Sequence, residues 1–184
     1  RRSNLKKEEV AVVLGGGPIG ALVAMVARTT GAKIVISEIN PVRIVMLEKM
    51  GFDVVNPTRQ SLLEHVKEVS NGALADVVFE VAGVQDAVNT MTEIAGLRAR
   101  IVGVAIHSQP RPTDLKMFFW RELSFIGARV YEYEDYEVAI ELVNKKELPL
   151  EKLITNVMPL GKIQNLFEEI VSNPSGMKFL VDCQ

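Results

Sequence analysis

The sequence has few of the residues that build metal sites and disulfides. Its 184 residues include one cysteine, Cys183, and two histidines. A single cysteine cannot form an internal disulfide, and a thiolate-rich zinc site within this chain is excluded. An excess of positive charge is also missing, because 21 basic residues stand against 23 acidic ones. A broadly basic surface that binds nucleic acid is therefore not expected.

Long apolar segments are absent as well. No run is long enough to span a bilayer, and residues 1–10 lack the apolar core of a signal peptide. Hydrophobic residues make up 48% and charged residues 24%, which is typical of a globular domain and not of a disordered chain. We therefore expect a cytoplasmic protein with no membrane partner. Because the sequence does not begin with methionine, we also expect that it was cut from a longer chain.

Strand-like apolar runs alternate with helical patterns over the first 130 residues. Strands separated by helical stretches of roughly 10–15 residues indicate right-handed crossovers and a parallel sheet. The sequence therefore predicts a doubly wound α/β fold with six parallel strands, a Rossmann fold. The predicted strands are 10–14, 33–38, 53–55, 76–80, 98–104 and 123–128.

Helical periodicity also predicts which side chains face the core. Apolar residues at i, i+3, i+4 and i+7 mark one helix face. For the first helix this face is Ile19, Leu22, Val23 and Val26, and for the second it is Val42, Val45, Met46 and Met50.

Beyond residue 130 the pattern changes. Helices are predicted around 136–143 and 163–170, and strands at 154–158 and 178–183. A six-stranded nucleotide-binding fold is complete without these elements, so we expect them to belong to a second structural body.

A glycine-rich segment joins the first strand to the first helix. Gly15, Gly17 and Gly20 fit the pattern G-x-G-x-x-G in the strand-to-helix position that dinucleotide binding requires. The first glycine permits the tight turn, the second lets the backbone approach a diphosphate, and the third allows close packing of helix on strand. The helix N-terminus adds free N–H groups and a positive dipole end, and Pro18 suits its first turn. The alternative is a glycine-rich turn without a ligand.

Glu38 ends the second strand, 18 residues after Gly20 and close to the expected spacing of about 20. A carboxylate there accepts hydrogen bonds from ribose 2′- and 3′-hydroxyls and repels a 2′-phosphate, which predicts NAD over NADP. Arg43 leaves the choice open, because it could stack on adenine, hold a 2′-phosphate or be a surface arginine.

Ligands of such sheets bind at the carboxyl ends of the strands. This rule adds Ala82, the stretch Val102, Gly103 and Val104, and the stretch 128–130 as candidate contacts. His107 follows the fifth strand near the same edge, but an ordinary loop histidine is the favoured interpretation. His65 is interpreted as a packed or partly exposed histidine of a helix.

The sequence resembles the coenzyme-binding half of the medium-chain dehydrogenases, in particular the zinc-dependent polyol, butanediol and threonine dehydrogenases. The resemblance covers nearly the whole chain, in order. It implies NAD binding by Gly15, Gly17, Pro18, Ile19, Gly20, Glu38 and Arg43, and backbone contacts to the nicotinamide end from Val102, Gly103, Val104, Arg129 and Val130. The matching segments are RRSNLKKEEVAVVLGGGPIG, SEINPVR, DVVFEVAG, ARIVGVA, WRELSFIGARVY, LPLEKLITNVMPL and KFLV.

The resemblance also implies a division of the chain. Residues 1–8 would be a linker from an upstream domain, residues 9–130 the NAD-binding domain, and residues 131–184 a return segment of a GroES-like catalytic domain. Zinc would be held by residues outside this chain, where it acidifies an alcohol that gives hydride to nicotinamide. The chain itself then supplies no catalytic and no metal-binding residue, and it should bind NAD(H) without oxidising an alcohol or polyol.

Two other functions stay open from the residues alone. One is a stand-alone nucleotide-binding or redox-sensing module without catalysis. The other is S-adenosylmethionine-dependent methyl transfer, which also uses a glycine-rich turn and an acidic residue after the second strand.

The resemblance further implies a homo-oligomer in which Leu123–Ala128 pairs with its copy across a two-fold axis. An unpaired strand edge of this kind is prone to association. The closing strand Lys178–Cys183 is expected to lack a partner within this chain, and so to be disordered or to borrow an edge from a neighbour.

Overall fold

A computed structural model describes residues 1–172 and 175–183. Six parallel strands form one sheet in the order β3-β2-β1-β4-β5-β6. This order reverses direction between β1 and β4, which is the arrangement of a doubly wound nucleotide-binding sheet. The predicted six-stranded α/β fold is confirmed. The strands are β1 Val10–Leu14, β2 Lys33–Ser37, β3 Asp53–Val55, β4 Ala75–Glu80, β5 Ala95–Gly103 and β6 Ser124–Gly127.

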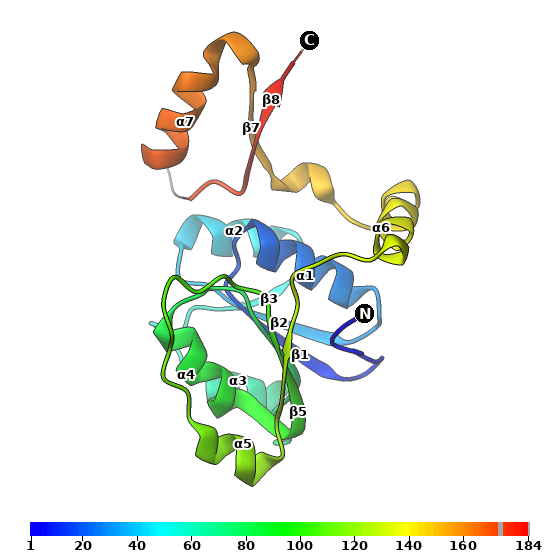
Figure 1. Ribbon diagram of the computed structural model, residues 1–184, viewed down its shortest axis with the longest axis vertical. Helices are drawn as coiled ribbons and strands as arrows, with labels where there is room; N and C mark the ends of the chain where they lie inside the picture. The colour runs from blue at the N-terminus through cyan, green and yellow to red at the C-terminus, as the bar shows by residue number, and fades with distance from the viewer. Residues whose placement is uncertain (173–174, 184) are drawn as a thin grey trace.

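Helices cover both faces of this sheet (Figure 1). On one face lie α1 (Pro18–Arg28) and α2 (Pro41–Lys49); on the other lie α3 (Leu62–Val69), α4 (Gln85–Ile94) and α5 (Leu115–Arg121). Among the described residues, no helix has both the length and the apolar character needed to cross a lipid bilayer.

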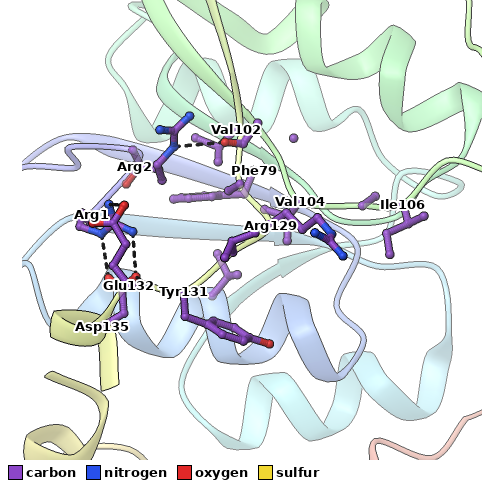
Figure 2. Close-up of a pocket in the computed structure, with 17 residues that line it drawn as sticks. Arg1, Arg2, Phe79, Val102, Val104, Ile106, Arg129, Tyr131, Glu132 and Asp135 are labelled. Atoms are coloured by element: carbon purple, nitrogen blue, oxygen red, sulfur yellow. Dashed lines mark hydrogen bonds and ion pairs between the residues drawn. The ribbon is translucent and has the colours of Figure 1, made fainter. Parts of the chain in front are cut away.

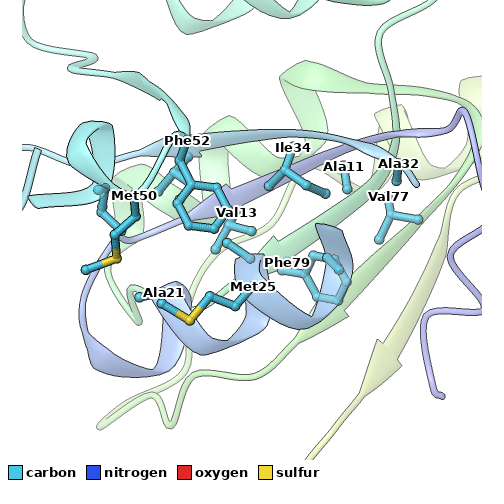
Figure 3. Close-up of a cluster of buried hydrophobic side chains, with 14 of the residues drawn as sticks. Ala11, Val13, Ala21, Met25, Ala32, Ile34, Met50, Phe52, Val77 and Phe79 are labelled. Atoms are coloured by element: carbon cyan, nitrogen blue, oxygen red, sulfur yellow. The ribbon is translucent and has the colours of Figure 1, made fainter. Parts of the chain in front are cut away.

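Alternate residues of the central strands feed two separate cores. Ala11 and Val13 of β1 pack toward α1, with Phe79 of β4 in the same cluster (Figure 3). Val12 and Leu14 of β1 point to the opposite face and pack with α3 and α4. Strands buried on both faces explain why their sequences are continuous apolar runs.

The predicted inward face of α1 is wrong. Ile19, Leu22 and Val26 are 55%, 37% and 43% exposed. The helix instead buries a face of small side chains together with Met25, and only Val23 of the predicted set packs against the core. Small residues let the helix axis approach the sheet closely, and this contact outweighs the burial of the larger apolar stripe. The buried residues of α1 are Gly20, Ala21, Ala24, Met25 and Ala27.

The face predicted for α2 is partly wrong. Val42 and Val45 are half exposed, whereas Leu47, which the periodicity did not select, is fully buried. Met46 and Met50 pack against the core as predicted. Asn40 caps this helix, because its side-chain oxygen accepts hydrogen bonds from two backbone N–H groups of the first turn.

Beyond residue 130 the chain forms a second body (Figure 1). A parallel pair of strands, β7 and β8, packs with α7. The expectation that the closing strand has no partner in this chain is therefore wrong, since β8 pairs with β7 along its length. Leu153 and Met177 join this body to the main core. The elements beyond residue 130 are α6 Tyr133–Asn144, which lies apart from β7, β8 and α7, the 3-10 turns Leu150–Leu153 and Leu160–Lys162, β7 Ile154–Pro159, α7 Ile163–Ser172 and β8 Lys178–Asp182.

The N-terminal segment is fastened to the sheet by Arg100 of β5. The guanidinium of Arg100 donates hydrogen bonds to the carbonyls of Ser3 and Asn4, at 2.9 and 2.6 Å, and to the carboxylate of Glu9 at 2.6 Å. Burial raises the pKa of Glu9, but the hydrogen bonds from Arg100 and the Lys6 N–H outweigh it, so the net shift is downward. Residues 1–4 are thereby held beside the ends of β5 and β6.

Candidate functional site

The glycine-rich turn lies at the carboxyl end of β1, as the sequence predicts. Gly15 has a left-handed φ of +105°, and its N–H donates to the carbonyl of Ser37 at 2.9 Å. A Cβ on Gly20 would overlap the carbonyl oxygen of Gly15, so only glycine fits there. A Cβ on Gly17 would meet nothing closer than the Arg43 guanidinium at 3.6 Å. The turn therefore leaves open backbone at Gly17, at the N-terminus of α1, whose first turn has no acidic residue.

Gly16 is a residue that the sequence pattern missed. A Cβ there would lie 2.6 Å from Leu47 and 3.0 Å from the Cβ of Glu38. Its N–H donates to Glu38 Oε2 at 2.9 Å. The pattern G-x-G-x-x-G allows any residue at this position, whereas the packing of α2 against the turn leaves room only for glycine.

The Glu38 carboxylate is buried, with 6% exposure, and it faces the glycine-rich turn. Its Oε1 accepts hydrogen bonds from the N–H groups of Ile39 and Asn40, at 2.7 and 2.8 Å. A carboxylate has about four acceptor positions, and these two bonds with the one from Gly16 fill three of them. One position on Oε2 then stays available to a ribose hydroxyl.

Arg43 lies beside this carboxylate and touches the C-terminal body. Its Nη1 is 3.9 Å from Glu38 Oε2, and its Nη2 donates to the carbonyl of Gly176 at 3.4 Å. Asn40 donates from its side chain to the Ser175 hydroxyl at 3.0 Å. The segment before β8 therefore forms a wall of the site, and nothing in the sequence pattern linked residues so far apart.

The other predicted contacts of this half lie around the same turn. Pro18 is the first residue of α1, and Ile19 after it is 55% exposed. Ala82 is exposed and lies against Gly15, since a Cβ on Gly15 would be 3.2 Å from it.

A pocket of about 740 Å³ lies at the ends of β5 and β6 (Figure 2). It brings together Val102, Gly103, Val104, Arg129 and Val130, all predicted as contacts of the nicotinamide end. The glycine-rich turn does not line it, so the candidate site consists of two adjoining parts. A Cβ on Gly103 would lie 2.6 Å from the tip of the Phe125 ring, so a larger residue here would displace that half-exposed side chain.

The arginines at the rim of the pocket differ in their hydrogen-bond and ion-pair partners. Arg1 is paired with Glu132 and Asp135, each at 2.8 Å, and the hydrogen bond between Arg1 and Asp135 lowers the pKa of the Asp135 carboxyl and raises that of the Arg1 guanidinium. Arg2 donates to the carbonyl of Gly127 at 3.1 Å. Among the described residues, the Arg129 guanidinium has no hydrogen bond or ion pair; in Figure 2 it extends beside Val104, away from the paired Arg1.

The two histidines both bind carboxylates. His65 of α3 lies 2.7 Å from Asp53 of β3, a contact between two structural elements away from the pocket. His107 lies 3.0 Å from Glu80, which is the last residue of β4 and almost fully buried. The sequence favoured an ordinary loop for His107 and gave Glu80 no role beyond the strand, so this contact was missed.

Comparison with known sequences decides the family. The sequence model described as zinc-binding dehydrogenase matches residues 18–145. The chain belongs to the zinc-binding dehydrogenase family.

Other zinc-binding dehydrogenases and their relatives resemble the whole chain. The 2-dehydro-3-deoxy-L-galactonate 5-dehydrogenase of Pseudoalteromonas atlantica is 49% identical over 183 residues, which cover 100% of this chain and 54% of that protein. The solved 2R,3R-butanediol dehydrogenase of Bacillus subtilis has a TM-score of 0.91 at 26% identity, covering 99% of this chain and 53% of that one. A zinc-binding dehydrogenase homologue of Sinorhizobium meliloti 1021, solved with NADP bound, has a TM-score of 0.85 at 26% identity, covering 98% and 54%. The chain spans about half the length of the curated relatives it matches.

The family name implies zinc, but the residues described here do not fit a zinc site. Across residues 1–172 and 175–183, no three histidine, cysteine, aspartate or glutamate side chains gather in a way that could hold a metal ion. A nicotinamide dinucleotide does fit the chain, because the open backbone at Gly17 adjoins a buried carboxylate that has an acceptor position left.

Proposed function

We propose that this chain binds the coenzyme of an NAD-dependent alcohol or polyol dehydrogenase. The observation that carries the proposal is the Glu38 carboxylate, buried against Gly16 of the glycine-rich turn. In this proposal the diphosphate lies on the backbone of Gly17 and the α1 N-terminus, Glu38 accepts a ribose hydroxyl, and Arg43 lines the adenosine end. The bound coenzyme supplies the acceptor for a hydride taken from the alcohol.

The nicotinamide half is proposed to occupy the pocket at the ends of β5 and β6. The ring is proposed to contact backbone groups of two stretches that line this pocket, Val102, Gly103 and Val104 in one and Arg129 and Val130 in the other. Ala82, which lies against Gly15, is proposed to contact the coenzyme beside the glycine-rich turn. Zinc and its ligands are proposed to belong to a part of the protein outside this chain.

The proposed substrate is a hydroxylated sugar derivative. The relatives' names include a sugar acid, galactonate, and a neutral diol, butanediol. The Arg129 guanidinium favours a sugar acid as the substrate. A cation without a partner, in the pocket where hydride transfer is proposed, can pair with the substrate's carboxylate.

The chain division is proposed as the resemblance implies it, with a linker over 1–8, a coenzyme domain over 9–130 and a GroES-like return segment over 131–184. A cytoplasmic location is proposed with it, which suits a chain with a single cysteine.

The purified 184-residue chain is expected to bind NADH in a saturable manner and to reduce no NAD with butanediol, sorbitol or a sugar acid. Binding is measured by calorimetric titration, with S-adenosylmethionine as a ligand of a rival function. Absence of NADH binding would contradict the coenzyme proposal, and robust turnover by the chain alone would contradict the location of the zinc site. A protein of its relatives' length that contains this chain should reduce NAD with one of these substrates.

We also propose that two copies associate through β6, which is an edge strand. Phe125 is 55% exposed there, and Trp120 of the neighbouring α5 is 64% exposed. Sedimentation velocity should show a dimer, and Ser124→Lys should shift it to monomer because a charge on an exposed edge blocks strand pairing. Gln164→Lys on α7 adds the same charge away from the edge and should leave the dimer intact. A wild-type chain that stays monomeric at high concentration would refute this interface.

A further inference from the structure

Glu80 is a buried acidic residue that has no role in the proposed coenzyme site. It ends β4 in the middle of the sheet, beside the point where the strand order reverses, and it is 1% exposed. A carboxylate taken out of water is costly unless hydrogen bonds compensate it. Burying Glu80 therefore has a considerable desolvation cost, which its hydrogen bonds must offset.

The two oxygens of Glu80 hold two different loops. Oε1 accepts a hydrogen bond at 2.7 Å from the N–H of Gly83, in the loop after β4. Oε2 accepts one at 3.0 Å from Nε2 of His107, in the loop after β5. Arg111 adds a longer bond, at 3.5 Å, from the second loop to the carbonyl of Gly83. One side chain thus fixes the spacing of two loops at the carboxyl edge of the sheet.

His107 is attached directly to the pocket wall. The preceding residues Val104, Ala105 and Ile106 line the pocket in which we place the nicotinamide half. The contact with Glu80 puts the ring proton on Nε2 and leaves Nδ1, which is buried, without a hydrogen-bond partner among the described residues. Packing alone does not require this pair, because apolar side chains of similar shape at both positions would avoid burying a carboxylate.

We propose that His107, held by Glu80, is a positioning residue for the nicotinamide half of the coenzyme. This inference rests on the proposed function. The Glu80–His107 hydrogen bond fixes the backbone of residues 104–106, and these in turn present their peptide groups to the nicotinamide riboside. The adenosine half binds at Gly17 and Glu38 and does not depend on this hydrogen bond.

The test separates the two halves of the coenzyme. NADH and ADP are titrated into the 184-residue chain and its variants, because ADP contains the adenosine half and the diphosphate but no nicotinamide. His107→Leu should weaken NADH binding about tenfold and leave ADP binding within about twofold. His107→Gln keeps an N–H donor near the Nε2 position and should restore most of the NADH affinity.

His65 provides the matched control, since it is the other histidine and also binds a carboxylate. His65→Leu should change neither affinity. Equal weakening of NADH and ADP by His107→Leu, or unchanged NADH binding, would overturn the positioning role, as would a His107→Gln variant no better than His107→Leu. A wild-type chain that binds neither ligand would instead contradict the coenzyme proposal.

Discussion

Replacing Gly20 by alanine is expected to destabilise the protein by about 3 kcal/mol, near the upper end of the usual cost of overpacking. The added Cβ would overlap the Gly15 carbonyl oxygen, which is backbone and cannot rotate away as a flexible side chain would. For a chain of this size, the melting temperature should fall by about 6–12 °C. Thermal unfolding followed by circular dichroism measures the change.

The substitution Gly17→Ala separates an effect on coenzyme binding from an effect on folding stability. Gly17 has a φ of −67°, which alanine adopts without strain, and its Cβ would meet only the Arg43 guanidinium at an ordinary distance. The melting temperature should therefore stay within about 2 °C of the wild type. NADH binding should nevertheless weaken at least about tenfold, because the methyl group occupies the approach of the diphosphate.

Gly161→Ala is the control, since a Cβ there meets no atom within 4 Å. It should change neither stability nor NADH affinity. If Gly17→Ala bound NADH as tightly as wild type, the diphosphate would have to lie elsewhere. If Gly20→Ala were as stable as wild type, the close contact of α1 with the turn would be relaxed at little cost.

The sheet could be predicted from sequence because both faces of each central strand are buried. Continuous apolar runs at the spacing of strand–helix units gave all six strands, with β1 and β3 at their observed bounds. β5 begins at Ala95, earlier than predicted, because it follows α4 without a loop and contains Arg98 with a positive φ of 58°. The pattern of apolar residues does not reveal a strand that begins in such an irregular conformation.

The helix faces were harder to predict, and α1 shows why. Periodicity selects large apolar residues, but the contact between α1 and the sheet is made by Gly20, Ala21 and Ala24. Small residues three to four positions apart are the sequence signal for a helix that lies close to the sheet. In α1 a stripe of large apolar residues has the same helical period, so periodicity alone does not choose between the two faces. Which face wins depends on the distance between helix and sheet, which local sequence does not specify.

The arrangement of the candidate site was predictable where a single local motif defines it. Gly15, Gly17, Gly20 and Glu38 lie together as expected, because strand, turn and helix follow one another in the chain. Contacts between distant segments were not predictable. The wall of Ser175 and Gly176 against α2 depends on how the second body packs.

Coenzyme choice is expected to depend on Glu38, and Glu38→Gln should lower the preference for NADH over NADPH by about tenfold or more. In the wild type, a 2′-phosphate would approach a buried carboxylate, and two negative charges in one desolvated place repel strongly. The neutral amide removes this repulsion, and the nearby Arg43 guanidinium can then pair with the phosphate.

The same substitution should weaken NADH itself. Two N–H groups, from Ile39 and Asn40, point at Oε1, so the amide oxygen of glutamine takes that place. Its NH₂ group then faces the N–H of Gly16, a donor against a donor, where the wild type has a hydrogen bond of 2.9 Å. Loss of a hydrogen bond to a charged group corresponds to about tenfold or more in affinity.

Titration of both coenzymes into wild type and variant measures the ratio of their dissociation constants. Glu48→Gln, at an exposed position near the other end of α2, also removes one negative charge and should leave the ratio unchanged. A wild-type chain that binds NADPH as tightly as NADH would show that Arg43, and not Glu38, governs the 2′ position. A ratio unaltered in Glu38→Gln would place the adenosine ribose away from this carboxylate, and the glycine-rich turn would then have to hold the dinucleotide without it.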